Sequence, residues 1–212
     1  IDQIARSDVN MVMTVNPQTK TILLTSIPRD SYVTLHSFGA EDKLTHSGIY
    51  GVEETVDTVE DWLDYDMNYY IKANFSMLVD IVDAIDGVDV YSDFEFKSSV
   101  ADFYYNEGEN HLSGMAALYF ARERKAFEDE DIERGRNQQK VLKAMINKTT
   151  QSKVILTKYT QLLDAVEDEM QTNMSEKDIS SLVKMQINDM GKWTINTISI
   201  TGTDAYAPTY SM

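Results

Sequence analysis

The sequence predicts one α/β or α+β domain, with a central mixed β-sheet flanked by helices on both faces. Strand-like and helix-like segments alternate along the chain, which is typical of sheets covered by helices. The 212 residues are enough for one sizeable core and few for two. No repeat, low-complexity tract or linker divides them. We therefore expect a single domain over residues 1–212.

In the first half, turn residues and apolar spacing define the expected elements. A turn at Pro17–Lys20 separates two β-rich segments and predicts a hairpin. Apolar residues at helical spacing predict two helices, the second capped by Asn74 or Ser76 and ended by Gly87. The expected strands are 10–16, 21–27, 31–35, 68–73 and 88–91, the expected helices are 52–63 and 75–86, and 36–47 is expected to be a polar loop.

The second half predicts long helices and a closing strand. Residues 92–110 are polar and aromatic-rich and favour neither helix nor strand. The acidic run at 128–131 is typical of a solvated loop. Ser175 and Asp178 have the spacing of a helix N-terminal capping pair. The expected helices are 112–118, 132–147, 153–170 and 179–190, and the expected strands are 119–124 and 193–200.

Composition excludes several classes of function. The formal net charge is −16, so the chain is a poor general binder of nucleic acid or of anionic membrane. Cysteine is absent, which excludes disulfides, thiolate metal ligands and thiol nucleophiles. No apolar run is long enough to span a bilayer. The chain starts at Ile1 without a signal peptide, so we expect any membrane anchor to lie outside it.

The arginines are few and grouped, unlike the scattered lysines. All six lie at or before residue 136, in four short clusters. Arginine is preferred where a planar fork must bind a carboxylate or phosphate. Arg122 and Arg124 would share a face on a strand, and Arg134 and Gln138 would share a face on a helix. These groups could converge on one polyanion, although four unrelated surface ion pairs would give the same composition.

No motif of nucleophilic catalysis is present. The sequence contains no G-x-S-x-G, Walker A or H-E-x-x-H pattern, and its three histidines show no metal spacing. Acidic residues are abundant, so a divalent cation site is easy to propose but hard to place.

A series of motifs in unbroken order resembles the LytR–CpsA–Psr family. The match covers roughly residues 5–150, and its specificity comes from the order, since any single motif would be weak. The Arg-Gly-Arg-Asn-Gln-Gln form and residues 171–175 resemble the streptococcal capsule branch. The motifs are 6–11 (RSDVNM), 26–33 (SIPRDSYV), 42–51 (DKLTHSGIYG), 69–75 (YYIKANF), 85–90 (IDGVDV), 111–114 (HLSG), 121–124 (ARER) and 131–139 (DIERGRNQQ).

The resemblance implies a glycopolymer phosphotransferase. Family members are anchored to the outer face of the Gram-positive cytoplasmic membrane. They move capsule, teichoic acid or a similar polymer from a polyprenyl-pyrophosphate carrier onto peptidoglycan. Arginines hold the pyrophosphate beside Mg²⁺ (Mn²⁺ is also acceptable), and the prenyl tail lies in an apolar tunnel between sheet and helices. The expected tunnel wall here includes Phe75, Leu78, Val79, Val82, Leu142, Met145, Ile146, Ile155 and Leu162, although apolar residues at helical spacing are more often ordinary core.

Carried over by motif, the resemblance assigns roles to individual residues. The catalytic residues would be Asp8, Arg29, Arg122 and Arg124. Asp8 would bind the metal, and the family's second aspartate would lie upstream of Ile1, outside this chain. We therefore expect the domain to be cut at its N-terminus. The residues expected to bind pyrophosphate are Arg6, Arg29, Arg122, Arg124, Arg134 and Gln138, with Arg136 structural.

The chemistry implied is phosphoryl transfer by charge neutralisation and alignment, which needs no covalent nucleophile. Asp8 is the better expected base for the acceptor hydroxyl, and Asp30 could instead orient Arg29. Two other functions remain open: a hydrolase of polyprenyl pyrophosphate, and a non-catalytic regulatory module that binds polyprenyl phosphate. Direct DNA contact is disfavoured because the chain is acidic and has no basic stripe.

Overall fold

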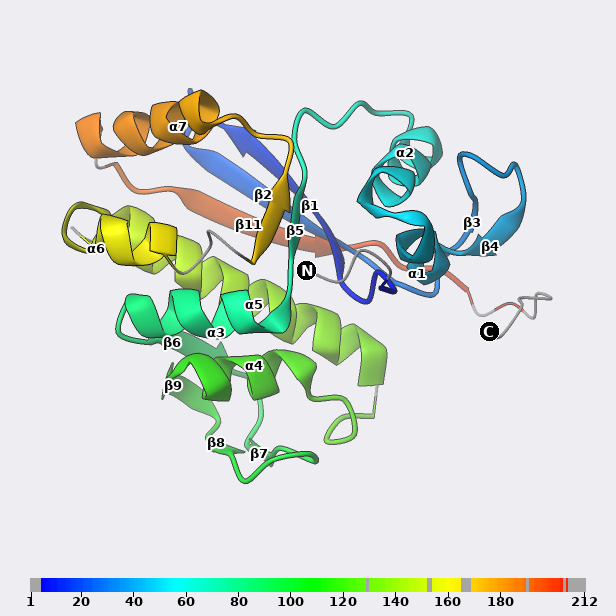
Figure 1. The fold of residues 1–212 in the computed structure, drawn as a ribbon. Coiled ribbons are helices and arrows are strands. Elements are labelled where there is room, and N and C mark those ends of the chain that lie inside the picture. The colour runs from blue at the N-terminus through cyan, green and yellow to red at the C-terminus, as the bar shows by residue number, and fades with distance from the viewer. Residues whose placement is uncertain are drawn as a thin grey trace.

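A mixed three-stranded sheet forms the centre of the molecule in the computed structural model, which describes residues 5–128, 130–151, 154–164, 169–189, 191–203 and 205. Its order is β1 (Asn10–Asn16), β2 (Thr21–Ile27) and β11 (Thr194–Ser199). β1 and β2 pair antiparallel as the predicted hairpin, and β11 runs parallel to β2 (Figure 1). The expectation of a central mixed sheet is confirmed.

Helices cover both faces of this sheet. Ile22 and Leu24 of β2 are buried in a cluster that includes Leu142 of α5 (Glu130–Gln151) and Met185 of α7 (Glu176–Asn188). Ile27 lies in a different cluster, with side chains of α2 (Val52–Leu63). Successive residues of a strand point to opposite faces, so this odd–even division places α5 and α7 on one face and α2 on the other.

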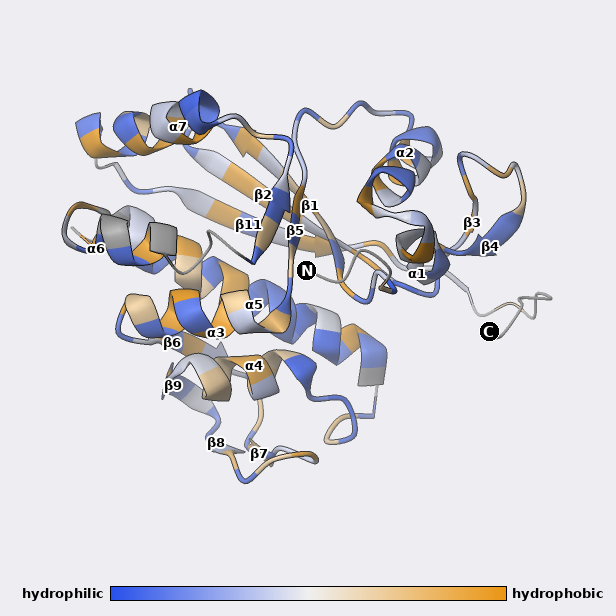
Figure 2. Cartoon of the chain, in the orientation of Figure 1, coloured by the Kyte–Doolittle hydropathy of each residue, from blue (hydrophilic) through white to orange (hydrophobic). Residues whose placement is uncertain are grey.

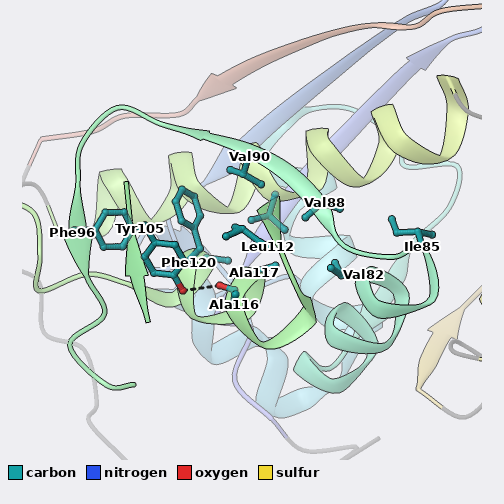
Figure 3. Packing of buried hydrophobic residues seen from close by; sticks show 12 residues of the cluster. Val82, Ile85, Val88, Val90, Phe96, Tyr105, Leu112, Ala116, Ala117 and Phe120 are labelled. Carbon is teal, nitrogen blue, oxygen red and sulfur yellow. Dashed lines mark hydrogen bonds between the residues drawn. The ribbon is translucent and has the colours of Figure 1, made fainter. Parts of the chain in front are cut away.

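A second layer lies beyond α5 and holds the largest apolar cluster. It consists of α3 (Phe75–Ala84), α4 (Gly114–Arg122), β6 (Val88–Ser92) and β9 (Gly108–Leu112) (Figure 1). Val82, Val88 and Phe120 are fully buried there, and the Tyr105 hydroxyl donates to the Ala116 carbonyl at 2.7 Å (Figure 3). α5 therefore joins the sheet to this second layer.

Apart from α6 (Val154–Asp164), the remaining elements are short. Figure 2 shows hydrophobic residues on the central strands and on α3 and α4, whereas β4 is hydrophilic. None of the helices in the described part of the chain is long and apolar enough to cross a membrane. The short elements are β3 (Tyr32–Thr34), β4 (Glu41–Lys43), α1 (Leu44–Ser47), η1 (Gly48–Tyr50), β5 (Ile71–Ala73), β7 (Phe96–Lys97), β8 (Tyr104–Tyr105) and β10 (Met170–Thr172).

Local side-chain chemistry predicted where α3 and α7 begin. The Asn74 side chain accepts a hydrogen bond from the Met77 amide at 2.9 Å, which confirms it as the cap of α3. Ser175 and Asp178 form the predicted capping box of α7. Each side chain satisfies an N–H group that has no partner within the helix.

The strand predicted over 119–124 is wrong. α4 continues to Arg122, and Glu123, with extended backbone angles, and Arg124 follow it without forming a strand. Ala117, Phe120 and Ala121 are buried at the spacing of one helical face. Packing on the second layer therefore extends the helix past the point where local pattern predicted a strand.

Three further segments differ from the prediction. The expected polar loop over 36–47 contains β4 and α1, and the unassigned segment 92–110 contains β7 and β8. Met170 lies in β10, paired with Ala73, and so it does not end a long helix. β10 pairs with β5, which lies far away in sequence, so local pattern carried no signal for it. β4, β7 and β8 pair with strands nearby in sequence, but each is too short to show an alternating pattern.

Candidate functional site

Arg29 lies in the turn at the end of β2, where it binds two carboxylates. Its Nη1 donates to Asp8 Oδ1 at 2.8 Å, and its Nε lies 3.4 Å from Asp30 Oδ2. Burial lowers the pKa of Arg29, but the hydrogen bond to Asp8 and the nearby carboxylates outweigh burial and raise it. Lys43 binds the other oxygen of Asp30 at 2.8 Å. Asp30 is thus held between two cations, as suits a residue that orients Arg29.

Backbone contacts hold the two ends of this site together. The Ser7 amide donates to the Thr45 carbonyl at 3.0 Å, and the Thr45 amide donates to the Arg29 carbonyl at 2.8 Å. A Cβ added at Gly48 would lie 2.6 Å from the Ala5 carbonyl oxygen and from the Ser7 nitrogen. Only a residue without a side chain allows the segment before β1 to approach η1 this closely.

Arg124 and Arg134 meet on one carboxylate. Arg124 Nη2 lies 2.9 Å from Asp131 Oδ2, and Arg134 Nη2 lies 2.8 Å from Asp131 Oδ1. Burial lowers the pKa of Arg134, Asp131 partly offsets this, and the positive charges of Arg124 and Arg29 lower it further. The charges of Arg29 and Asp8 also shift the pKa of Arg134. The structure therefore brings both halves of the predicted cationic site together.

Arg122 has a different setting from the one predicted. It is the last residue of α4, and its guanidinium carbon lies 4.8 Å from the centre of the Phe75 ring. The expectation that Arg122 and Arg124 share a strand face is wrong, because no strand forms there. An exposed aromatic face instead fixes the Arg122 guanidinium.

Three further predicted residues have distinct surroundings. Arg6 is exposed, in the segment that packs against η1. Gln138 is half-buried, whereas its neighbour Gln139 is buried and donates to the carbonyls of Leu24 and Ile198. Arg136 is exposed and paired with Glu133, in keeping with a structural part.

Sequence reasoning missed two residues of this region. Asp131 had been assigned to a solvated acidic run, yet it bridges two arginines. Glu123 is 1% exposed, the lowest exposure among the buried charged side chains of the described residues. The sequence signal for Glu123 was its position between two arginines. A carboxylate flanked by cations either pairs with them or, when it is buried, must find other hydrogen-bond partners.

The donor set for a metal ion is sparse. Among the described residues, no group of three His, Cys, Asp or Glu side chains could hold a metal. Mg²⁺ usually takes one or two carboxylates and completes its shell with water and phosphate oxygens. The Asp8 side chain is 49% exposed and supplies one hard oxygen ligand of the right chemistry.

Comparison with known proteins identifies the family of this chain. The model of the LytR_cpsA_psr family matches residues 1–212. The chain belongs to this family. The LytR_cpsA_psr assignment agrees with the motif order found in the sequence, and the assignment to its capsule-type branch stays a prediction.

A curated relative shows how similar the chain is to named proteins. The chain is 38% identical over 175 residues to the polyisoprenyl-teichoic acid–peptidoglycan teichoic acid transferase TagU of Bacillus licheniformis, covering 82% of this chain and 56% of that protein. The chain thus spans little more than half the length of this curated relative.

Solved structures show the same fold. B. subtilis TagV has a TM-score of 0.80 at 32% identity, covering 97% of this chain and 81% of that one. TagT bound to LI-WTA has a TM-score of 0.76 at 32% identity, covering 94% of this chain and 75% of that one. The predicted α/β class is therefore confirmed as that of LytR_cpsA_psr domains.

Proposed function

We propose that this domain transfers a glycopolymer from a polyprenyl-pyrophosphate carrier onto peptidoglycan. The observation that carries the proposal is the convergence of Arg29, Arg124 and Arg134, from three separate segments, around Asp8 and Asp131. Forked cations held by carboxylates suit an anion with two adjacent phosphates. The similarity to TagU, a teichoic acid transferase, and to TagT bound to LI-WTA supports this choice of substrate.

The residues would act by aligning and neutralising the pyrophosphate. An acceptor hydroxyl oxygen attacks the phosphorus nearer the glycopolymer, the bond from that phosphorus to the bridging oxygen breaks, and polyprenyl phosphate leaves. Arg29, Arg124 and Arg134 stabilise the charge on the phosphoryl and leaving oxygens. Asp8 is the proposed acceptor of the hydroxyl proton. Asp30 suits this task less, because Arg29 and Lys43 occupy it and keep its pKa below the ordinary value although burial raises it.

Pyrophosphate binding would also involve the flanking predicted residues. In this proposal Arg122 at the end of α4, Gln138 of α5 and Arg6 before β1 supply further contacts to the pyrophosphate. The proposed metal is Mg²⁺, or Mn²⁺ in its place, with Asp8 as its one ligand in this chain. A bound cation would neutralise phosphate charge beside the arginines. Transfer that persists undiminished in excess chelator would count against it.

The prenyl tail is proposed to lie in an apolar tunnel between the sheet and the helices. Large apolar side chains remain exposed on neighbouring elements: Ile71 of β5 is 60% exposed, Phe75 of α3 43% and Leu156 of α6 50%. α3 and α6 are in contact, and β5 leads directly into α3. Of these three, Phe75 is a wall residue predicted from the sequence. The predicted wall residue Val82 is instead fully buried in the largest apolar cluster, and Leu142 and Ile146 pack against the cluster of the central sheet. The predicted wall residue Ile155 lies outside the described side chains.

The proposed site of action is the outer face of the cytoplasmic membrane and the cell wall of a Gram-positive bacterium, with an anchor supplied outside this chain. A lipid-linked polymer and its peptidoglycan acceptor would both be within reach there. The polymer is teichoic acid, capsule or a related polysaccharide.

A transfer assay tests the proposal. The chain is incubated with a polyprenyl-pyrophosphate-linked oligosaccharide and uncross-linked peptidoglycan, and polymer bound to the acceptor is measured. We expect transfer that Arg29→Ala, Arg122→Ala or Arg124→Ala each reduces. Release of polyprenyl phosphate without polymer on peptidoglycan would instead identify a pyrophosphate hydrolase, and binding without either product a regulatory module.

A further inference from the structure

Glu123 is a buried carboxylate with no part in the chemistry proposed above. It is 1% exposed and follows the last residue of α4. Its neighbours in sequence, Arg122 and Arg124, both belong to the proposed pyrophosphate site. A charged side chain is almost never buried to this extent unless it is paired or fully hydrogen-bonded.

The partners of Glu123 are backbone N–H groups and the Ser99 side chain. Its Oε2 accepts from the Ser99 amide at 2.6 Å, and its Oε1 accepts from the amides of Arg124 at 3.0 Å and Ala126 at 3.2 Å. Burial raises the pKa of Glu123, but these hydrogen bonds outweigh burial and keep the pKa below the ordinary value. The side chain therefore stays ionised and accepts three backbone hydrogen bonds.

These contacts fix the direction of both arginines. The carboxylate points inward and binds the backbone of Arg124 itself, while its second oxygen binds the loop that follows β7. Arg122 on one side stacks on Phe75, and Arg124 on the other reaches Asp131. The inward position of Glu123 thus separates two guanidinium groups that the sequence places only two residues apart.

We infer that Glu123 is a positioning residue, which holds the Arg122–Arg124 segment in the geometry that binds pyrophosphate. The inference rests on the proposed function, because it concerns the same anion site. Glutamine in place of Glu123 would keep the shape but turn one acceptor into an NH₂ donor. Whichever way that amide is turned, it faces an N–H group of Ser99 or of the 124–126 turn, so at least one hydrogen bond is lost.

The test compares Glu123→Gln with Glu128→Gln, which removes the same charge at an exposed position of the same loop. Affinity for geranylgeranyl diphosphate is measured by calorimetry well below the melting temperature of each variant. We expect Glu123→Gln to weaken binding by about tenfold and Glu128→Gln to leave it unchanged.

A second readout separates positioning from stability. Phenylglyoxal modification of Arg124, located by mass spectrometry, follows the accessibility of its guanidinium without needing any ligand. We expect faster modification in Glu123→Gln than in wild type or Glu128→Gln. If Glu123→Gln does not fold, Glu123→Asp, which keeps the charge but shortens the reach, takes its place in both measurements.

The outcomes distinguish the two proposals. Wild-type affinity and wild-type Arg124 modification in the Glu123 variant would overturn the role of Glu123. Failure of the wild-type chain to bind the diphosphate would overturn the proposed function, while the modification rates would still decide whether Glu123 positions Arg124.

Discussion

The guanidinium of Arg29 lies 2.8 Å from the carboxylate of Asp8, although 21 residues separate them in sequence. Asp8 precedes β1 and Arg29 follows β2, so the antiparallel hairpin returns the chain to the same end of the sheet. Such a pair holds the cation in place and leaves its remaining N–H groups for an anion. This ion pair therefore places Arg29 and Asp8 together at the end of the sheet where the candidate site lies.

Arg134→Ala should weaken diphosphate binding, and Arg136→Ala should not. Arg134 is 14% exposed and faces the other site arginines, whereas Arg136 is 55% exposed and pairs with Glu133. A charge-assisted contact contributes about 1.5–3 kcal/mol, or roughly 10- to 150-fold in affinity. Calorimetry with geranylgeranyl diphosphate measures both variants. Equal loss in the two would show that the effect is general charge.

Phe75→Leu should weaken binding through Arg122. The ring supports the guanidinium at 4.8 Å, and leucine keeps apolar bulk without the negative face of the aromatic ring. We expect a loss of about 0.5–1 kcal/mol, or roughly two- to fivefold in affinity. Phe75→Tyr keeps the ring and serves as the control. In an Arg122→Ala background the same leucine substitution should have a smaller effect, and an undiminished effect would contradict the contact.

Gly48→Ala should destabilise the fold and lower activity together. The helical backbone of Gly48, with φ at −61°, tolerates alanine, so the cost comes only from the 2.6 Å approach to backbone atoms of Ala5 and Ser7. Overpacking of this kind costs about 1–3 kcal/mol. Urea unfolding measures the free energy, with Gly202→Ala as control because nothing lies within 4 Å of its added Cβ. Wild-type stability in Gly48→Ala would contradict this prediction, because the segment before β1 would then have shifted without cost to make room for the added Cβ.

The stability contribution of Glu123 should depend on pH. Its folded pKa lies below the ordinary value of 4.5, so the ionised carboxylate stabilises the fold above that pH. The contribution declines as pH falls below 4.5 and through the folded pKa. The free energy of unfolding should therefore differ most between wild type and Glu123→Gln at neutral pH, and less in acid. Urea titrations at several pH values measure the gap, and a gap that widens in acid would contradict this sign.

Parts of the fold and of the candidate site could be predicted from the sequence, because their signals were local or lay in the order of motifs along the chain. The hairpin turn, the Asn74 cap and the Ser175–Asp178 capping box follow from side-chain chemistry within a few residues. The order of the motifs indicated the family to which the chain belongs, and the grouping of the arginines predicts a polyanion site. The spacing of Arg134 and Gln138 also correctly placed both on one helix.

Tertiary structure alone decided how these groups meet. Whether Arg122 ends a helix or lies on a strand depended on packing of Ala117 and Phe120 against a layer formed elsewhere in the chain. The contact of Asp131 with Arg124 and that of Glu123 with the Ser99 amide likewise join separate segments, so no local pattern identifies them. From sequence alone a charged residue is assigned to the solvated surface, because the same carboxylate can face water, an arginine or a row of backbone amides and only the fold decides which.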